Sequence, residues 1–399
     1  MTTRQAILVL NAGSSSLKFA VYTLGDDAPR CQVRGQFAGL PDQPRFRARD
    51  AGGRSLIDSR PGTPDHEQAL RHLLAWLAET FPDVSLVTAG HRVVHGGSRF
   101  TAPVRLDPAV RQDLEELVPL APLHMPHNLA AIDILARLQP ALPQVACFDT
   151  AFHHTLPLRE QHYALPREWY DRGVRRYGFH GLSYEYIASV LPDHLGADAD
   201  RRIIVAHLGH GASLCALHRR QSVATTMGLT PLDGIPMATR PGSLDPGIPV
   251  YMMREAGLDV EAVDDVLNHH SGLLGLSGIS GDMQTLLASP HPHAAEAVDH
   301  FVYHTHRAIA SLAAVLGGLD ALVFTAGIGE NAPLIRKRIC REAAWLGIGI
   351  DAEANAANAT RISLPDSRVS VWRIPTDEES VIARHTHRLL SGPANGEQP

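Results

Sequence analysis

Short apolar runs alternate along the chain with segments in which apolar residues recur every three or four positions. Such runs predict buried strands, and here they cover residues 85–89, 144–148, 321–324 and 368–372. The helical spacing is clearest after Thr63 and Pro64, which predict a helix start, and again over residues 294–316. Alternation of the two patterns predicts an α/β fold.

Two segments about half a chain apart share one pattern of strand, polar residue, apolar residue and glycine. They are residues 7–13 (ILVLNAG) and 203–209 (IIVAHLG). Each is followed by a turn of small or polar residues and then by a second apolar run, 17–22 or 214–217. This similarity predicts a duplicated domain whose opening hairpin carries a tight turn facing phosphate.

Composition narrows the class of protein. A chain of 399 residues with 44% hydrophobic residues predicts two globular domains. The net charge of −6 and the lack of a long basic stripe argue against a nucleic-acid partner, and the short basic stretch 45–49 is interpreted as a solvated hairpin or loop. The apolar run 6–10 is too short for a signal peptide or a membrane span.

The four cysteines lie far apart and form no CxxC pair, which argues against a disulfide framework and a structural zinc site and fits a reducing cytoplasm. The adjacent histidines at 153–154 and 269–270 have no third ligand at metal spacing. A structural transition metal is therefore not expected.

Three glycine-containing segments could hold phosphate through clustered backbone N–H groups: residues 11–18 (NAGSSSLK), 209–211 (GHG) and 326–331 (AGIGEN). The first could equally be an ordinary hairpin turn. The third superficially resembles a dinucleotide fingerprint, but Ala332 stands where the third glycine belongs. We interpret it as a strand–loop–helix element that receives a nucleotide. No P-loop motif occurs.

Four charged residues could act on a phosphoryl group: Arg92 after the strand 85–89, Asp149 at the end of the strand 144–148, His180, and Arg240 in a Pro/Gly-rich loop. The alternatives are solvated arginines and an aspartate that caps a helix. Residues 376–379 (TDEE) form a Thr-x-x-Glu pattern that predicts a capping box. Glu379 would then reach back to the helix start, which leaves Glu378 as the better metal ligand.

Taken together, these segments resemble the acetate kinase family. The resemblance extends from residue 7 to about 388, and its motifs occur in order at residues 11–18, 91–97, 148–153, 175–181, 207–209, 239–242, 324–331 and 374–379.

The resemblance implies two duplicated actin-like domains, of the class that includes sugar kinases, Hsp70 and ribonuclease H, flanking an active-site cleft. Residues 1–150 would form the first domain, completed by a returning segment at about 380–391. Residues 151–379 would form the nucleotide-binding and dimerisation domain. Residues 392–399 are expected to be a disordered tail.

The resemblance also implies a reaction: reversible, direct in-line transfer of a phosphoryl group from ATP to acetate, giving acetyl phosphate and ADP. The expected cofactor is Mg²⁺, or Mn²⁺ in its place. The expected protein is a cytoplasmic homodimer that acts on small molecules, without a nucleic-acid or membrane partner.

Site residues follow by positional match to the family motifs. Metal support would come from Asn11 and Glu378. Phosphoryl transfer would depend on Asp149, His180 and Arg240. The acetate carboxylate would be bound by Arg92, and the methyl group by Val94, Leu123, Phe179 and Pro231. ATP would be bound by Lys18, His207, Leu208, Gly209, His210, Gly211, Asp282, Met283, Gln284, Gly327, Ile328, Gly329, Glu330 and Asn331.

Three positions depart from the family pattern. His210 stands where Asn is usual, Gln284 where Arg is usual, and Met125 interrupts a His-Asn-Pro motif. A protonated His210 would add positive charge near phosphate, so we hypothesise an unusually pH-sensitive nucleotide affinity. A nucleotide KM that stays flat between about pH 5.5 and 8 would contradict this hypothesis.

Other functions fit parts of the pattern. The same chemistry on propionate or butyrate is one, because one methylene changes discrimination by only about 1–3 kcal/mol. A non-catalytic, ATP-switching actin-like protein is another, although the four charged residues argue against it. A nicotinamide dehydrogenase would depend on the 327–329 glycines alone.

Overall fold

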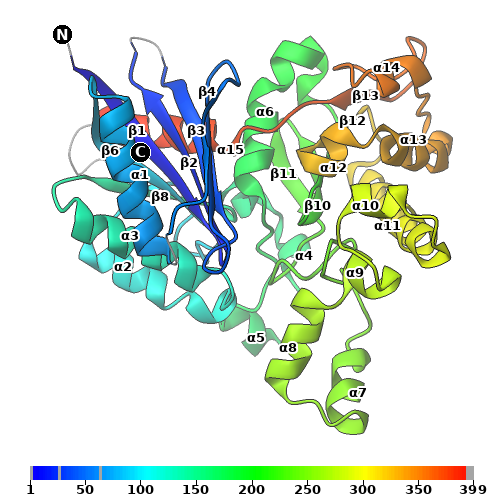
Figure 1. The fold of residues 1–399 in the computed structure, drawn as a ribbon. Helices are drawn as coiled ribbons and strands as arrows, with labels where there is room; N and C mark the ends of the chain where they lie inside the picture. The colour runs from blue at the N-terminus through cyan, green and yellow to red at the C-terminus, as the bar shows by residue number, and fades with distance from the viewer. Residues whose placement is uncertain (1–2, 26–27, 63–64, 392–399) are drawn as a thin grey trace. The chain divides into compact units, whose positions relative to one another are not determined.

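The computed structural model describes residues 3–25, 28–62 and 65–391, which form two compact α/β units (Figure 1). The first unit contains the chain up to Ala151 together with the C-terminal segment from Asp377. The second unit spans Phe152–Thr376. Among the described residues, no helix has the length and apolar character needed to span a lipid bilayer.

The first unit is built on a sheet with the strand order β5-β4-β3-β2-β1-β6-β8-β7. Its strands are β1 (Arg4–Ala12), β2 (Ser16–Thr23), β3 (Arg30–Ala38), β4 (Arg45–Asp50), β5 (Ser55–Ser59), β6 (Val84–Val93), β7 (Val104–Arg105) and β8 (Gln144–Phe148). Its α-helices are α1 (His66–Thr80), α2 (Pro108–Glu115), α3 (Met125–Leu138) and α15 (Glu378–Ser391).

The second unit is built on a sheet with the strand order β11-β10-β9-β12-β13. Its strands are β9 (Ile203–Leu208), β10 (Ala212–His218), β11 (Gln221–Thr225), β12 (Ala321–Thr325) and β13 (Ser370–Arg373). Its α-helices are α4 (Leu158–Gln161), α5 (Arg167–Asp171), α6 (Gly181–Leu195), α7 (Gly247–Glu255), α8 (Val260–His269), α9 (Gly272–Ser277), α10 (Met283–Ala288), α11 (Pro292–Leu316), α12 (Ala326–Asn331), α13 (Pro333–Glu342) and α14 (Ala352–Ala356).

The two sheets share one plan. In the first, β1, β2 and β3 are antiparallel neighbours, and β6 and then β8 extend the sheet in parallel from β1. In the second, β9, β10 and β11 are antiparallel neighbours, and β12 and then β13 extend it in parallel from β9. The duplicated α/β fold predicted from the two opening hairpins is therefore confirmed.

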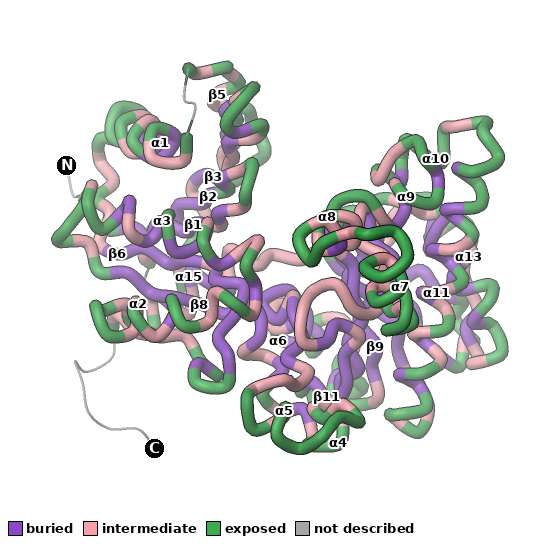
Figure 2. Tube along the Cα trace, turned by 90° about the horizontal axis from the view of Figure 1, so that it is seen from below, coloured by how far each residue is buried: buried purple, intermediate pink, exposed green. Residues whose placement is uncertain are grey.

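In the first unit, helices cover both faces of the sheet. Leu70, Leu73 and Leu77 of α1 pack with residues of α3 into the core on one face. Helix α15 packs on the other face, where Gly90 of β6 leaves room for it, because a Cβ there would lie 2.6 Å from Ile382 Cγ2. In Figure 2 the central strands β1 and β8 of this sheet are largely buried, whereas β5 at its edge is more exposed. The close approach of α15 fixes the position of Glu378 in its first turn.

In the second unit, α6 packs on one face of the sheet and α11 contacts β9, β10 and β11. Tyr184, Ile187 and Leu191 lie at helical spacing on α6 and are buried against β9 and β10. This packing holds the first turn of α6, and with it His180, against the β9–β10 hairpin.

The predicted start of the first helix is not where the structure has it. Thr63 and Pro64 lie outside the described residues, and α1 begins at His66. Asp65 is the N-cap, because its side chain accepts a hydrogen bond from the backbone N–H of Gln68 at 2.7 Å. The predicted tail 392–399 also falls outside the described residues.

The predicted capping box at residues 376–379 is wrong. Asp377 caps α15 instead, and its carboxylate accepts from the N–H of Ser380 at 3.2 Å. The N–H of Thr376 donates to Glu330 Oε1 at 3.1 Å, so it needs no bond from Glu379. Glu378 nevertheless remains the carboxylate that turns toward the other predicted site residues.

Two buried histidines give the first unit an acid-sensitive stability. His91 and His95 are 2% and 0% exposed, and burial lowers the pKa of each from 6.5 to about 4. As the pH falls, these histidines are protonated in the unfolded chain before they are protonated in the folded protein. Each histidine therefore contributes up to about 3 kcal/mol to the free energy of unfolding above pH 6.5, and this contribution is lost as the pH falls toward 4. We expect the urea unfolding midpoint to fall over this range. The fall should be smaller in His91→Gln and unchanged in His218→Gln, which alters an exposed histidine.

Candidate active site

The predicted site residues of the first unit gather around Arg92, at the end of β6. Its Nε and Nη2 donate to the two carboxylate oxygens of Asp149, at 2.9 and 2.5 Å. Its Nη1 donates to Asn11 Oδ1 at 3.3 Å, and Glu378 Oε2 lies 4.0 Å from its Nε. The structure thus brings together four residues from four distant segments. We call Asn11, Arg92, Asp149 and Glu378 the Arg92 cluster.

Negative charge is in excess within the Arg92 cluster. The side chain of Asp149 is 1% exposed, that of Glu378 19% and that of Arg92 24%. Burial alone would lower the pKa of Arg92, but the Asp149 carboxylate more than offsets this, and the pKa is raised. Burial raises the pKa of Glu378 to about 7, with Arg92 opposing the shift and Asp149 and Glu379 adding to it. One guanidinium therefore faces more carboxylate than it neutralises.

This donor set suits a small divalent cation. Asn11 and Glu378 offer hard oxygen ligands, and a cation would relieve the excess negative charge around Glu378. Within the described part of the chain, no three His, Cys, Asp or Glu side chains form a metal-binding group. Mg²⁺ takes few protein ligands and completes its shell with water and substrate phosphates, so two oxygen-bearing side chains would be enough to support it.

Asn128 was not predicted, yet it supports the same end of the sheet. It lies on α3 and is 6% exposed. Its Oδ1 accepts from the N–H of Val94 at 2.9 Å, and its Nδ2 donates to the carbonyl of Ala12 at 2.7 Å. Asn128 thereby links the segments that carry Arg92 and Asn11. Leu123, which like Val94 was predicted to contact the methyl group, is half-buried just before α3.

Lys18 lies beside Asn11 on the opening hairpin. The two residues are partners in the antiparallel β1–β2 ladder, and Lys18 is exposed. Directly opposed residues in such a ladder project from the same face of the sheet. The ammonium group is therefore carried on the face of the sheet that also presents the Asn11 amide.

The predicted site residues of the second unit gather around the β9–β10 turn. His180 has a left-handed backbone (φ +59°) at the start of α6, and its Nδ1 lies 2.8 Å from Ser213 Oγ. Its ring stacks on that of His207 with centroids 4.2 Å apart. His207 is in turn held by Ser183, whose Oγ lies 2.8 Å from its Nδ1.

Arg240 and His180 both approach the turn at Gly211. A Cβ on Gly211 would lie 2.9 Å from Arg240 Nη2 and 3.2 Å from His180 Nε2. A side chain at residue 211 would displace the Arg240 guanidinium from this position. Arg240 Nη1 donates to the carbonyl of Pro231 at 2.8 Å. We call His180, His207, Gly211 and Arg240 the His180 cluster, which places two nitrogen-rich side chains at a turn of backbone N–H groups.

The other predicted apolar contact in this unit, Phe179, is 1% exposed. Its carbonyl oxygen lies 2.9 Å from His153 Nε2, whose ring also contacts Ser222 Oγ at 2.8 Å. His153 therefore has a structural role next to His180.

The two predicted nucleotide segments of this unit are neighbours. A Cβ on Gly209 would lie 3.6 Å from Ala326 Cβ and 3.9 Å from the backbone nitrogen of Gly327. The prediction of a loop at residues 326–331 is wrong, because these residues form the short helix α12. Ala326 opens it with φ +64°, and its N–H donates to Glu330 Oε1 at 2.8 Å. Asn331 Nδ2 donates to the carbonyl of Gly327 at 3.0 Å. Leu208 and Gly329 are buried, and Ile328 is half-buried.

Arg336, which was not predicted, supports this segment from behind. It is 0% exposed, and burial lowers its pKa to about 10. Its Nη1 donates to the carbonyls of Gly329 and Glu330, each at 2.9 Å. Its remaining donors reach Asn355 and the Asn358 side chain at 2.6–2.9 Å. All these acceptors are neutral, so the cation stays positive behind α12.

Arg336→Met is expected to lower the free energy of unfolding by about 3–5 kcal/mol, because several buried carbonyl groups lose their donor. Since two of these carbonyls belong to α12, the KM for ATP should rise more than the KM for a second substrate. Urea titration and steady-state kinetics would measure both. A loss of stability with an unchanged ATP KM would restrict Arg336 to a structural role.

The predicted segment 282–284 begins α10. Asp282 is its N-cap and accepts from the N–H of Thr285 at 2.8 Å, while Met283 is buried and Gln284 is exposed. Asp282 also affects the pKa of His210. Burial and the Arg240 charge lower this pKa, and the Asp282 carboxylate partly offsets the decrease. His210 is thus electrostatically coupled to both Asp282 and Arg240.

The lowered pKa of His210 restricts the hypothesised pH sensitivity to acid solution. Above about pH 6.5 the imidazole is neutral, so the KM for ATP should be flat there. At lower pH the added charge should tighten ATP binding by at most about fivefold, as expected of one solvent-accessible charge. His210→Asn should abolish that tightening. The same pH series on this variant is the control, because it retains the titration of the nucleotide itself.

Comparisons with known proteins bear on the whole chain. A sequence profile of the Acetokinase family matches residues 6–384. The chain is 54% identical over 392 residues to an acetate kinase of Rhodopseudomonas palustris (strain ATCC BAA-98 / CGA009), covering 97% of this chain and 98% of that protein. It is 50% identical to an acetate kinase of Rhizobium meliloti, with 97% and 99% covered.

Two solved structures are also similar. A crystal structure of Porphyromonas gingivalis acetate kinase superposes with a TM-score of 0.86 at 34% identity, covering 97% of this chain and 100% of that one. A propionate kinase from Francisella tularensis subsp. tularensis SCHU S4 gives 0.89 at 36% identity, with the same coverage.

Proposed function

The chain belongs to the Acetokinase family, and we propose that it catalyses the reversible transfer of the γ-phosphoryl group of ATP to acetate, giving acetyl phosphate and ADP. The observation that carries the proposal is the Arg92 cluster, in which a largely buried guanidinium is held by Asp149. The relatives named above match almost the entire chain, and the two from Rhodopseudomonas palustris and Rhizobium meliloti are acetate kinases.

The Arg92 guanidinium has donors to spare for a carboxylate. It carries five N–H groups, of which three are used by Asp149 and Asn11 within the described structure. We assign the remaining two to the carboxylate of acetate. Asp149 then acts by holding the guanidinium at the reacting centre, and Val94, Leu123, Phe179 and Pro231 are assigned to the methyl group.

A carboxylate is already a nucleophile, so the reaction needs no strong general base. The obstacle is repulsion between two anions, and cations reduce it. We assign Arg240 and His180 to the transferring phosphoryl group, and Lys18 and residues 207–211, 282–284 and 327–331 to the nucleotide. Asn11 and Glu378 would hold Mg²⁺, or Mn²⁺ in its place, which supplies positive charge to the phosphates.

The test is a hydroxylamine trap for acyl phosphate in the presence of ATP and Mg²⁺. Acetate, propionate and butyrate are compared side by side, and acetate should give the highest kcat/KM. A higher kcat/KM with propionate would reassign the substrate. A rate of ADP release that does not change when any of the three acids is added would instead support an ATP-switching protein.

We further propose a cytoplasmic homodimer, formed through the second unit. Helix α7 of that unit has no buried residue, and Ile248, Val250, Tyr251 and Met253 are all at least 38% exposed. Apolar surface of this kind is typical of a subunit interface. Sedimentation analysis of the purified protein would give the mass directly.

A further inference from the structure

Strand β4 carries a row of arginines on one face of the first unit's sheet. Phe46 and Ala48 point into the core shared with α1, and they alternate with Arg45, Arg47 and Arg49, which are all exposed. Because successive side chains of a strand point to opposite faces, the three arginines project from the face that does not carry α1. The short basic stretch 45–49 is therefore an ordered strand with its charges on one side.

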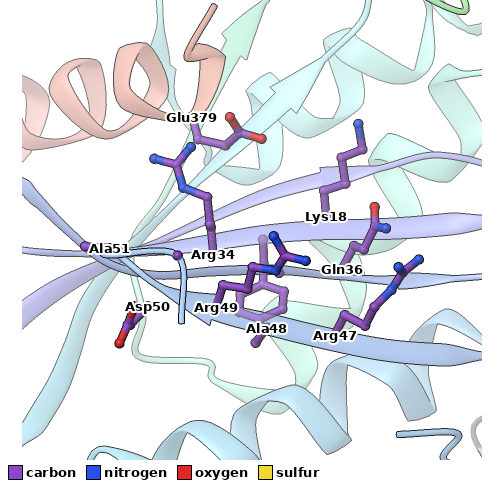
Figure 3. Close-up of a pocket in the computed structure, with 12 residues that line it drawn as sticks. Lys18, Arg34, Gln36, Arg47, Ala48, Arg49, Asp50, Ala51 and Glu379 are labelled. Atoms are coloured by element: carbon purple, nitrogen blue, oxygen red, sulfur yellow. The ribbon is translucent and has the colours of Figure 1, made fainter. Parts of the chain in front are cut away.

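Neighbouring strands add to this positive charge. In the sheet register Arg49 is the partner of Arg34 on β3, and Arg47 is the partner of Gln36. Gln36 in turn is the partner of Lys18 on β2. Figure 3 shows these side chains projecting from the same side of the strands. We call Lys18, Arg34, Arg47 and Arg49 the basic hollow.

The basic hollow is an open, concave part of the surface. It has a volume of about 650 Å³, with Gly35 in its lining and Glu379 of α15 at its edge (Figure 3). Known small-molecule sites have volumes of about 300–1,000 Å³. The space is therefore sufficient for a metabolite of ordinary size.

The positive charge in the hollow is only partly compensated. Arg34 pairs with Asp377 at 3.3 Å. Asp58 pairs with Arg45 at 2.7 Å, and as the ladder partner of Arg47 it also interacts electrostatically with Arg47 and Arg49. No ion pair is formed by Arg47 or Arg49 with any residue that the structure describes. Arg34 and Arg49 are moreover like charges in directly opposed positions, which destabilises a ladder unless an anion lies between them.

We propose that the basic hollow binds a small anion with two or more phosphate or carboxylate groups. Several guanidinium groups on adjacent strands can each donate a pair of hydrogen bonds to such an oxyanion. Arg34 is already held in place by Asp377, so part of the site is preorganised. The hollow shares Lys18 with the nucleotide assignment made above, whereas Arg34, Arg47 and Arg49 are assigned to no step of the reaction.

The test is isothermal titration of the purified enzyme with pyrophosphate and, separately, with a tricarboxylate, at matched ionic strength. Arg47→Ala/Arg49→Ala should weaken the binding of at least one of them by about tenfold or more, equivalent to about 1.4 kcal/mol, because the charge-assisted hydrogen bonds of two guanidinium groups are lost. The two anions distinguish a phosphate ligand from a carboxylate ligand.

The matched control is Arg71→Ala/Arg137→Ala. It also removes two arginines that are each 59% exposed, from α1 and α3, which pack on the opposite face of the sheet. This control should bind both anions like the wild type. Equal affinity in the two double variants, or no binding to the wild type, would overturn the proposal. If Arg47→Ala/Arg49→Ala fails to fold, the single variants Arg47→Gln and Arg49→Gln are titrated in its place. Unchanged anion affinity in both single variants would overturn the proposal.

Discussion

Replacement of Arg240 by alanine is expected to lower kcat for acetyl phosphate formation by about 10²–10³, while KM for ATP and acetate changes much less. The reason is positional. The loop that carries Arg240 is fixed by backbone hydrogen bonds, including Ser271 N–H to Thr239 O at 3.0 Å and Leu273 N–H to Met237 O at 2.9 Å. The guanidinium is therefore held at the Gly211 turn before substrate arrives, and a preorganised cation stabilises charge that develops during transfer.

Steady-state kinetics on three variants would measure the effect. Arg240→Lys retains the charge but loses the planar fork, so its kcat should fall between those of the wild type and the alanine variant. Arg220→Ala removes an exposed arginine from the same unit, paired with Asp200 at 2.7 Å, and should change kcat less than twofold. Near-normal turnover in Arg240→Ala would remove Arg240 from the mechanism.

Much of the fold was predictable because its signal is local. The strand–turn–strand patterns at residues 7–22 and 203–217 each lie within about 20 residues, and they appear as the hairpins β1–β2 and β9–β10. The buried strands 85–89, 144–148 and 321–324 were also found, because a run of apolar residues needs no partner to be visible. Helix starts were less predictable: Asp65 and Asp377 cap α1 and α15, where neighbouring threonines had seemed as suitable.

The candidate site could be proposed from the sequence as a set of residues, but its geometry could not. The bond between Arg92 and Asp149 depends on the parallel register of β6 and β8, in which Arg92 pairs with Cys147. No sequence pattern encodes that register. The choice of Glu378 over Glu379 as a metal ligand stays a prediction, but the capping box from which it was argued is wrong: the N–H of Thr376 donates to Glu330, and Glu379 lines the basic hollow.

Two missed features did leave a signal. Arg336 stands next to Ile335 and three and four positions before Ile339 and Cys340, all buried on α13, so it occupies the apolar face of a helix. A cation at such a position indicates a specific set of buried acceptors. The arginines at 45, 47 and 49 alternate with period two, which is typical of one face of a strand.

Replacement of Arg92 by alanine should have two separable consequences. The carboxylates of Asp149 and Glu378 lose the cation that partly neutralises them, and this should lower the free energy of unfolding by about 3–5 kcal/mol. Acetate loses its proposed donor pair, which should lower kcat/KM for acetate by about 10³-fold, equivalent to about 4 kcal/mol. Urea titration and the hydroxylamine trap measure the two effects independently.

A double variant separates the two consequences. Arg92→Ala/Asp149→Ala removes the buried carboxylate together with its partner, so much of the lost stability should return, as expected for a directly coupled pair. Activity should stay as low as in Arg92→Ala, because the acetate carboxylate still lacks its guanidinium. A double variant that recovered both stability and kcat/KM would show that Arg92 serves only to neutralise Asp149. The carboxylate of the substrate would then have to be bound by another cation.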